Sequence, residues 1–76
     1  MYFGEWLSDQ LALVEKSQQA LATAIGTTQP LVNRWCNSKT LPGLEYFFRL
    51  IGALALWRGV TKQDILVEII KDVWIY

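Results

Sequence analysis

The chain has 76 residues, with seven Lys and Arg balanced by seven Asp and Glu, no His, and 53% hydrophobic residues. This length predicts a single domain, and a hydrophobic composition without net charge argues against intrinsic disorder. Zero net charge also gives the chain no overall attraction to nucleic acid or to anionic membranes.

The first predicted helix covers residues 2–16, where apolar residues recur at the spacing of one helix face. Glu5, Asp9 and Glu15 fall on the opposite side. Acidic side chains in the first half of a helix also suit the positive end of its dipole. The apolar face consists of Phe3, Trp6, Leu7, Leu11 and Val14.

Two short helices are predicted next, the first over residues 18–25. Ser17 can cap its start, and Gly26 can adopt the left-handed conformation that ends it. Pro30 fits the first turn of the second helix, where its missing N–H costs nothing, and one of the threonines at 27–28 can cap that helix. The buried sides are formed by Leu21, Ala22 and Ile25 in the first helix and by Leu31, Val32 and Trp35 in the second.

A fourth helix is predicted over residues 43–56, and Arg58 with Gly59 marks its end. Its apolar residues form a broad stripe, which predicts that this is the central and most buried helix. The stripe consists of Leu44, Phe47, Ile51 and Leu54, widened by Phe48, Leu50 and Ala55.

The last predicted helix covers residues 61–72 and begins with Thr61 and Asp64, which are spaced as a capping box with Asp in place of Glu. Residues 73–76 are either its final turn or a short strand. The predicted fold class is therefore an all-α, compact bundle of about five helices that forms a single domain.

The C-terminal segment carries more apolar residues than one helix face can bury. Residues such as Val67 fall outside the face that can pack inward, and this surplus indicates a second burial surface. Our interpretation is a dimer contact within residues 61–76; the alternative is that so small a domain uses every apolar side chain in its own core. The candidate contact residues are Ile70, Val73, Trp74 and Tyr76.

Several classes of site are excluded by what the sequence lacks. Cys36 is the only cysteine, which excludes an intrachain disulfide and a thiolate zinc site. Without His, the commonest general base is missing and no Ser-His-Asp triad can form. No Gly-rich phosphate loop, secretory signal or apolar run of about 20 residues is present. We therefore expect a cytoplasmic protein that is not an enzyme and uses neither a metal nor another cofactor.

The two short helices and their turn are spaced as a helix-turn-helix. Counted from Gln18 as the first position, the small Ala22 is fifth, where the helices must approach, and Gly26 is ninth, in the turn. Val32 and Trp35 are fifteenth and eighteenth, where they pack the second helix onto the first. In this motif the first helix crosses the DNA backbone and the second places its N-terminal side chains in the major groove.

This part of the chain resembles the lambda repressor/Cro-like helix-turn-helix regulators. The similarity is carried by Ser-Gln-Gln-Ala-Leu-Ala at 17–22, by Ile-Gly-Thr-Thr-Gln-Pro-Leu-Val-Asn-Arg-Trp at 25–35, and by the loop and helix start at 39–45. It covers about residues 16–54, or half of the chain. The resemblance implies a compact all-α fold, double-stranded operator DNA as the ligand, and usually a dimer on a two-fold site.

The resemblance also implies roles for individual residues. Gln18 would contact a phosphate and brace Gln29, which would read a base, because an amide can bond adenine bidentately. Asn33 would be a second reader, and Arg34 would contact either a guanine or a phosphate. Two residues depart from the family's pattern. Pro30 stands where the family usually has a small polar residue, and Thr27 stands where it prefers an apolar one. The remaining predicted backbone contacts are Thr28, Asn37, Ser38 and Lys39.

Charge is distributed unevenly along the chain. Residues 16–43 contain Lys16, Arg34 and Lys39 and no acidic residue, so the proposed DNA-facing unit carries +3 within a neutral chain. Our functional hypothesis is a sequence-specific transcriptional regulator, repressor or activator, that is associated with the nucleoid when bound to DNA. Because three positive charges are few, binding would require a homodimer. The alternative is a protein-interaction module on the same fold, such as an antitoxin, an inhibitor or a phage-encoded regulator, that docks through its apolar C-terminus.

Overall fold

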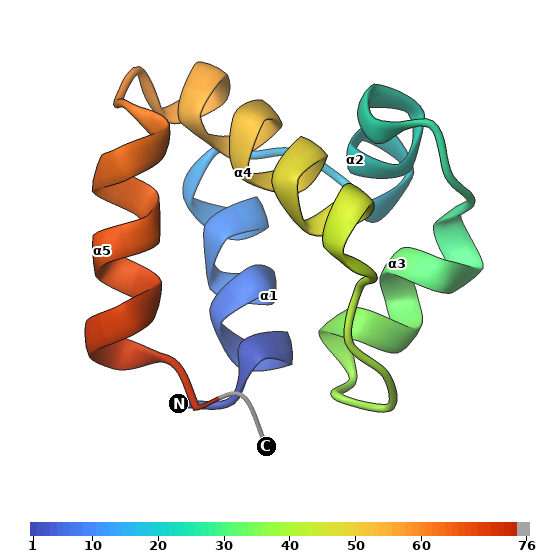
Figure 1. The fold of residues 1–76 in the computed structure, drawn as a ribbon. Coiled ribbons are helices and arrows are strands. Elements are labelled where there is room, and N and C mark those ends of the chain that lie inside the picture. The colour runs from blue at the N-terminus through green and yellow to red at the C-terminus, as the bar shows by residue number, and fades with distance from the viewer. Residues whose placement is uncertain (75–76) are drawn as a thin grey trace.

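The computed structural model describes residues 1–74 and confirms the all-α fold. Figure 1 shows α1 between α5 and α3, with α4 crossing above them. Within the described residues there is no strand, only an isolated parallel bridge between Tyr2 and Trp74. None of the helices in this part of the chain has the length and hydropathy that a membrane crossing needs. The five helices are α1 (Phe3–Leu13), α2 (Gln18–Ile25), α3 (Gln29–Cys36), α4 (Leu44–Arg58) and α5 (Lys62–Asp72).

Local sequence signals determine most helix ends. The Ser17 hydroxyl accepts a hydrogen bond from the Ala20 N–H at 3.0 Å, as a cap of α2 should. Thr61 and Asp64 each accept a hydrogen bond from the backbone N–H of the other at 3.1 Å, which confirms the capping box of α5. α1 ends earlier than predicted, at Leu13, because the backbone turns sharply after it and Glu15 has φ +56°.

Residues 73–74, the described part of the chain after α5, form neither a final helical turn nor a strand. Val73 is extended, and the Trp74 N–H donates to the Met1 carbonyl at 2.7 Å, so this segment pairs with the N-terminus. Val73, one of the candidate dimer contacts, is only 8% exposed and belongs to the protomer's own core, so it offers little surface to a second copy. Tyr76, another of those candidates, lies outside the described residues.

The core is centred on α1 rather than on α4. Six of the eleven residues of α1 are buried, against four of the fifteen in α4, so the prediction that α4 is the most buried helix is wrong. Leu44 and Phe48 are 70% and 57% exposed. The reason is the helical period, because residues four apart, such as Leu44 and Phe48, drift by about 40° around a helix. They therefore leave the side of α4 on which Leu50, Ile51 and Leu54 face the core.

A glycine allows α1 to approach the end of α3 closely. A Cβ added at Gly4 would lie 2.5 Å from Ser38 Oγ and 2.6 Å from the carbonyl oxygens of Cys36 and Trp35. Any larger residue would force the helices apart, because backbone carbonyls cannot move aside as a flexible side chain can. Gly4 therefore determines where the carboxyl end of α3 lies.

A polar cluster joins α1 to the end of α4 and to α5. Arg58 Nη2 forms an ion pair with Glu68 Oε2 at 3.1 Å, and Gln10, which is 6% exposed, accepts from Arg58 Nη1 at 2.8 Å. The Trp6 indole donates to Glu68 Oε1 at 3.0 Å. Burial alone would raise the pKa of Glu68, but the hydrogen bonds that its carboxylate accepts, first among them that from Arg58, outweigh burial and lower this pKa.

Candidate nucleic-acid interface

The turn between α2 and α3 is held from both sides. Gly26 has φ +79°, and its N–H donates to the Ala22 carbonyl at 3.0 Å. From α4, Arg49 Nη1 donates to the carbonyl of Ile25 at 3.1 Å while its other amine pairs with Glu45. The Arg49 side chain thereby closes the carboxyl end of α2, where a cation also suits the helix dipole.

The packing residues of the motif lie where the spacing requires. Ala22 and Val32 are fully buried and Trp35 is 1% exposed, so α3 is packed firmly against α2 and the core. This burial settles Trp35 as a core residue. The opposite side of α3 is left to solvent and carries the polar side chains Asn33 and Arg34.

Four side-chain amides form a continuous chain across α2 and α3. Gln18 Oε1 accepts from Gln29 Nε2 at 2.7 Å and from Asn33 Nδ2 at 3.2 Å. Asn37 Nδ2 in turn donates to Asn33 Oδ1 at 3.0 Å. The start of α2 is thereby tied to the first turn, the middle and the end of α3. The structure thus brings together the predicted residues Gln18, Gln29, Asn33 and Asn37.

The chain of four amides leaves hydrogen-bonding capacity for a ligand. Within residues 1–74, Gln29 Oε1 has no hydrogen-bond partner, and Gln29 Nε2 keeps a second hydrogen beyond the one it donates to Gln18. One acceptor and one donor side by side are what an adenine edge requires. Because Gln18 already orders the Gln29 side chain, little rotamer entropy remains to be lost on binding.

Sequence reasoning missed the contribution of Cys36 to this chain. Its thiol is half-buried, and the side chains of Gln18 and Ser8 are close enough to act on its pKa. Burial raises the pKa of the Cys36 thiol, more than these two side chains lower it. The Cys36 thiol is therefore neutral beside Gln18. Its position at the end of α3 could have suggested this, but no motif marks it.

The loop after α3 uses its backbone to close the helix. The N–H groups of Asn37, Ser38 and Lys39 donate to carbonyls within α3 at 3.0, 3.1 and 2.9 Å. Only the side chains of this loop can therefore reach a phosphate. Ser38 Oγ lies against Gly4 of α1, which makes Ser38 the least suitably placed of the three.

The cations of the motif differ in their surroundings. Arg34 and Lys39 are exposed, and neither forms an ion pair with any other residue in the described part of the chain. Lys16 Nζ instead lies 5.3 Å from the centroid of the Trp57 ring, near the end of α4. The Thr28 side chain precedes α3 without capping it, so its hydroxyl is available to a ligand.

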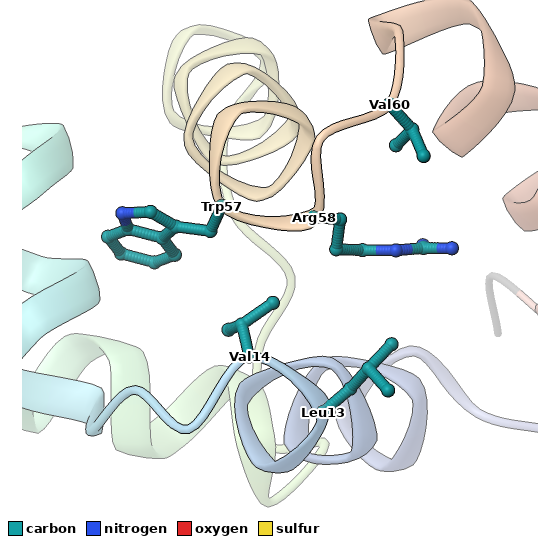
Figure 2. Close-up of a pocket in the computed structure, with 5 residues that line it drawn as sticks. All are labelled: Leu13, Val14, Trp57, Arg58 and Val60. Carbon is teal, nitrogen blue, oxygen red and sulfur yellow. The ribbon is translucent and has the colours of Figure 1, made fainter.

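A shallow hollow lies elsewhere, between the ends of α1 and α4. It is lined by Leu13, Val14, Trp57, Arg58 and Val60 (Figure 2). Trp57 and Arg58 point away from each other, and Arg58 is engaged with Glu68. Among residues 1–74 no cluster of three His, Cys, Asp or Glu side chains could hold a metal ion. The polar side chains that could bind a ligand therefore converge on α2 and α3.

Comparison with known proteins bears on the same elements. A family model described as helix-turn-helix matches residues 10–56, more than half of the chain. The match begins in α1, includes all of α2, the turn and α3, and extends into α4. No significant match was found among curated proteins or solved structures.

Proposed function

We propose, on the premise that the chain belongs to the Cro/C1-type helix-turn-helix family of DNA-binding regulators, that it is a sequence-specific transcriptional regulator that binds a short operator as a homodimer. It would act in the cytoplasm on nucleoid DNA. Gln29 and Asn33 read bases, Arg34 contacts a guanine or a phosphate, and the phosphates are held by Gln18, Thr28, Asn37, Ser38 and Lys39.

The amide chain is the observation that supports this proposal. An isolated surface glutamine has no reason to be ordered, whereas Gln29, in the first turn of α3, donates a hydrogen bond to Gln18 at 2.7 Å. In a helix-turn-helix, side chains at this end of the second helix meet base edges. The side chains favour A·T pairs, because amides match adenine whereas Arg34 alone could read guanine bidentately.

The electrostatics of α2, α3 and their loops are consistent with a polyanion. Residues 16–43 contain no acidic side chain, so nothing there repels phosphate. Since Lys16 lies against Trp57, Arg34 and Lys39 remain as the cations on this side. Two cations release few counterions, and this small number is the reason that we propose two copies on one operator.

The experiment is binding-site selection from a randomised duplex pool, repeated at low and moderate salt. We expect one enriched, A·T-rich sequence with two-fold symmetry, and an affinity that falls as salt rises, because phosphate contacts release counterions. The Gln18→Ala variant should lose the enriched sequence, while Gln19→Ala, a neighbouring glutamine bonded only to Thr23, should keep it. Absence of any enriched sequence for the wild-type chain would contradict the proposal.

A second function is favoured by the outer face of α5. Val67, Ile70 and Trp74 are 44%, 81% and 59% exposed, and the Tyr2 ring packs edge-on against Trp74 at 5.2 Å. Large exposed apolar patches mark interaction sites. Ile70 on α5 and Trp74 just after it are two of our candidates for a dimer contact, and the same surface would serve a protein partner in an antitoxin or inhibitor. Purification of one stoichiometric partner with a chain that retains no DNA would support this alternative.

A further inference from the structure

Gln18 is a junction at which two side chains of α3 share one acceptor atom. Gln18 Oε1 accepts from Gln29 Nε2 at 2.7 Å and from Asn33 Nδ2 at 3.2 Å. A carbonyl oxygen has two lone pairs, so these two bonds use its whole accepting capacity. The family resemblance implies that Gln18 braces Gln29, but it implies no link to Asn33. In this chain both proposed base readers depend on the same atom.

Neither reader can turn its amide on its own. A half turn of the Gln29 amide would set its carbonyl oxygen against Gln18 Oε1, and two acceptors would then face each other without a hydrogen between them. The same holds for Asn33, whose Oδ1 also accepts from Asn37 Nδ2 at 3.0 Å. A half turn of the Asn33 amide alone would therefore break bonds on both of its sides.

The whole chain of amides has a second arrangement with the same number of hydrogen bonds. If all four amides turn, Gln18 Nε2 donates its two hydrogens to Gln29 and Asn33, and Asn33 Nδ2 donates to Asn37. All three bonds are kept, and each runs in the opposite direction. The two arrangements therefore differ in the spare donors and acceptors that the readers offer to a ligand.

The direction of the chain decides which base each reader suits. In the structure Gln29 offers two lone pairs and one hydrogen, which suit the N6 donor and the N7 acceptor of adenine. In the reversed chain it would offer one lone pair and two hydrogens. Guanine carries the acceptor O6 where adenine carries its N6 donor, so a guanine at this position favours the reversed chain. Reversal also exchanges the oxygen and nitrogen of Asn33, and with them the base that Asn33 suits.

Binding to DNA makes this linkage stricter. In the free protein the bonds from Asn33 to Gln18 and Asn37 are exposed, so water can replace a partner that turns away. At an interface with DNA part of this water is displaced, and a polar group without a partner then costs free energy. We therefore expect the four amides to satisfy one another fully when the readers contact bases.

We propose that Gln18 is a specificity-determining residue that couples the two readers, so that the base preferred by Gln29 and the base preferred by Asn33 depend on each other. This rests on the proposed function, which makes both residues base readers. Contacts at well-separated base pairs contribute almost independently, whereas side chains in one hydrogen-bond network do not. Two combinations of bases, one for each direction of the chain, should therefore bind better than the separate preferences predict.

The test measures affinity for every combination of bases at the two operator positions at which Gln29→Ala and Asn33→Ala relax specificity. For the wild type, the fold-loss from at least one double base change should be smaller than the product of the two single losses, by about threefold or more. In Gln18→Glu the carboxylate only accepts, which holds the chain in one direction. Its single losses should therefore multiply to within about twofold. Coupling that arises within the DNA itself would persist in this variant.

Gln19→Glu is the matched control, because it places the same charge one residue later, on an exposed side chain bonded only to Thr23. Both variants should weaken binding to all duplexes through their charge, but Gln19→Glu should keep the coupling of the wild type. The proposal is overturned if the wild-type losses multiply independently, if Gln18→Glu keeps the coupling, or if Gln19→Glu loses it.

The side-chain NH2 signals of the free protein separate this proposal from the one it rests on. In proton–nitrogen correlation spectra, Gln18→Glu should shift the NH2 signals of both Gln29 and Asn33, whereas Gln19→Glu should leave both almost unchanged. A shift at Gln29 alone would overturn the coupling whatever the result with DNA. If both signals shift and the wild type binds no DNA, the proposed function fails and the junction at Gln18 stands.

Discussion

Two amide-centred networks, one on the surface and one in the interior, organise opposite sides of this molecule. On the proposed DNA-facing side Gln18, which is half-buried, accepts from Gln29 and from the exposed Asn33. Behind α4, Gln10 is 6% exposed and lies between Arg58 and Glu68. The side-chain amide therefore occurs in two environments of different dielectric constant. Its burial decides whether it contributes to stability or to the orientation of side chains.

In the interior the network holds the fold together. The Arg58–Glu68 ion pair is partly buried, with side chains 19% and 29% exposed; such a pair contributes little net stability, but removing one partner leaves the other charged and less well solvated than in water. On the surface water can replace any lost bond, so the Gln18 network contributes little to stability and instead fixes the orientation of side chains. Damage to the first network should therefore appear in unfolding, and damage to the second in recognition.

The largest expected effect is on stability, from Glu68→Ala. It leaves Arg58, whose side chain is 19% exposed, without its carboxylate and deprives Trp6 of its acceptor. We expect a loss of about 2–4 kcal/mol in the free energy of unfolding, measured by urea denaturation. Asp9→Ala, an exposed acid on α1, should change stability by less than about 0.5 kcal/mol. Equal effects of the two variants would remove the distinction between the networks.

The next effect is on recognition, from Gln29→Ala. Loss of a bidentate base contact should cost about 1–3 kcal/mol of discrimination at one or two operator positions. Urea denaturation should show almost no change, because water can take up the bonds that Gln18 loses. Competition titrations with single-base operator variants measure the discrimination. A drop in stability without relaxed specificity would mean that Gln29 stabilises the fold, as the interior network does, and does not read a base.

How far the sequence predicts each network depends on distance along the chain. The caps at Ser17 and Thr61 involve partners three residues away, and the helix-turn-helix spacing lies within twenty residues, so both could be predicted. The interior cluster joins Gln10 to Arg58 and Glu68, which lie 48 and 58 positions later in the sequence. No local pattern marks such pairs. The exposure of Phe48 could not be predicted for a related reason. Periodicity identifies the apolar side of a helix but not where the neighbouring helices end.

A smaller effect is expected from Lys39→Ala, which removes one of the exposed cations of the proposed DNA-facing side. Phosphate contacts carry no sequence information, so affinity should fall by a similar factor for all duplexes and the salt slope should decrease by about one. Lys71→Ala on α5 is the matched control and should leave binding unchanged. If Lys39→Ala altered the preferred sequence, Lys39 would have to be a base reader.

The smallest effect concerns the acid dependence of the interior network. The pKa of Glu68 in the folded chain lies below its ordinary value of 4.5, as a carboxylate bonded to Arg58 should. The unfolded chain therefore takes up this proton more readily than the folded chain does. The stabilisation is fully present above pH 4.5 and is lost as the pH falls through the lower, folded pKa.

This loss should be smaller than that from Glu68→Ala, because the protonated side chain still fills its space and its carbonyl oxygen can accept from Trp6. Other carboxylates also titrate in acid, so the measurement is the difference between wild type and Glu68→Gln in melting temperature from pH 6 to pH 3. The two curves should converge as the pH falls. Parallel curves would show that the Glu68 charge does not stabilise the fold, and the interior network would then resemble the surface one in depending on bond geometry alone.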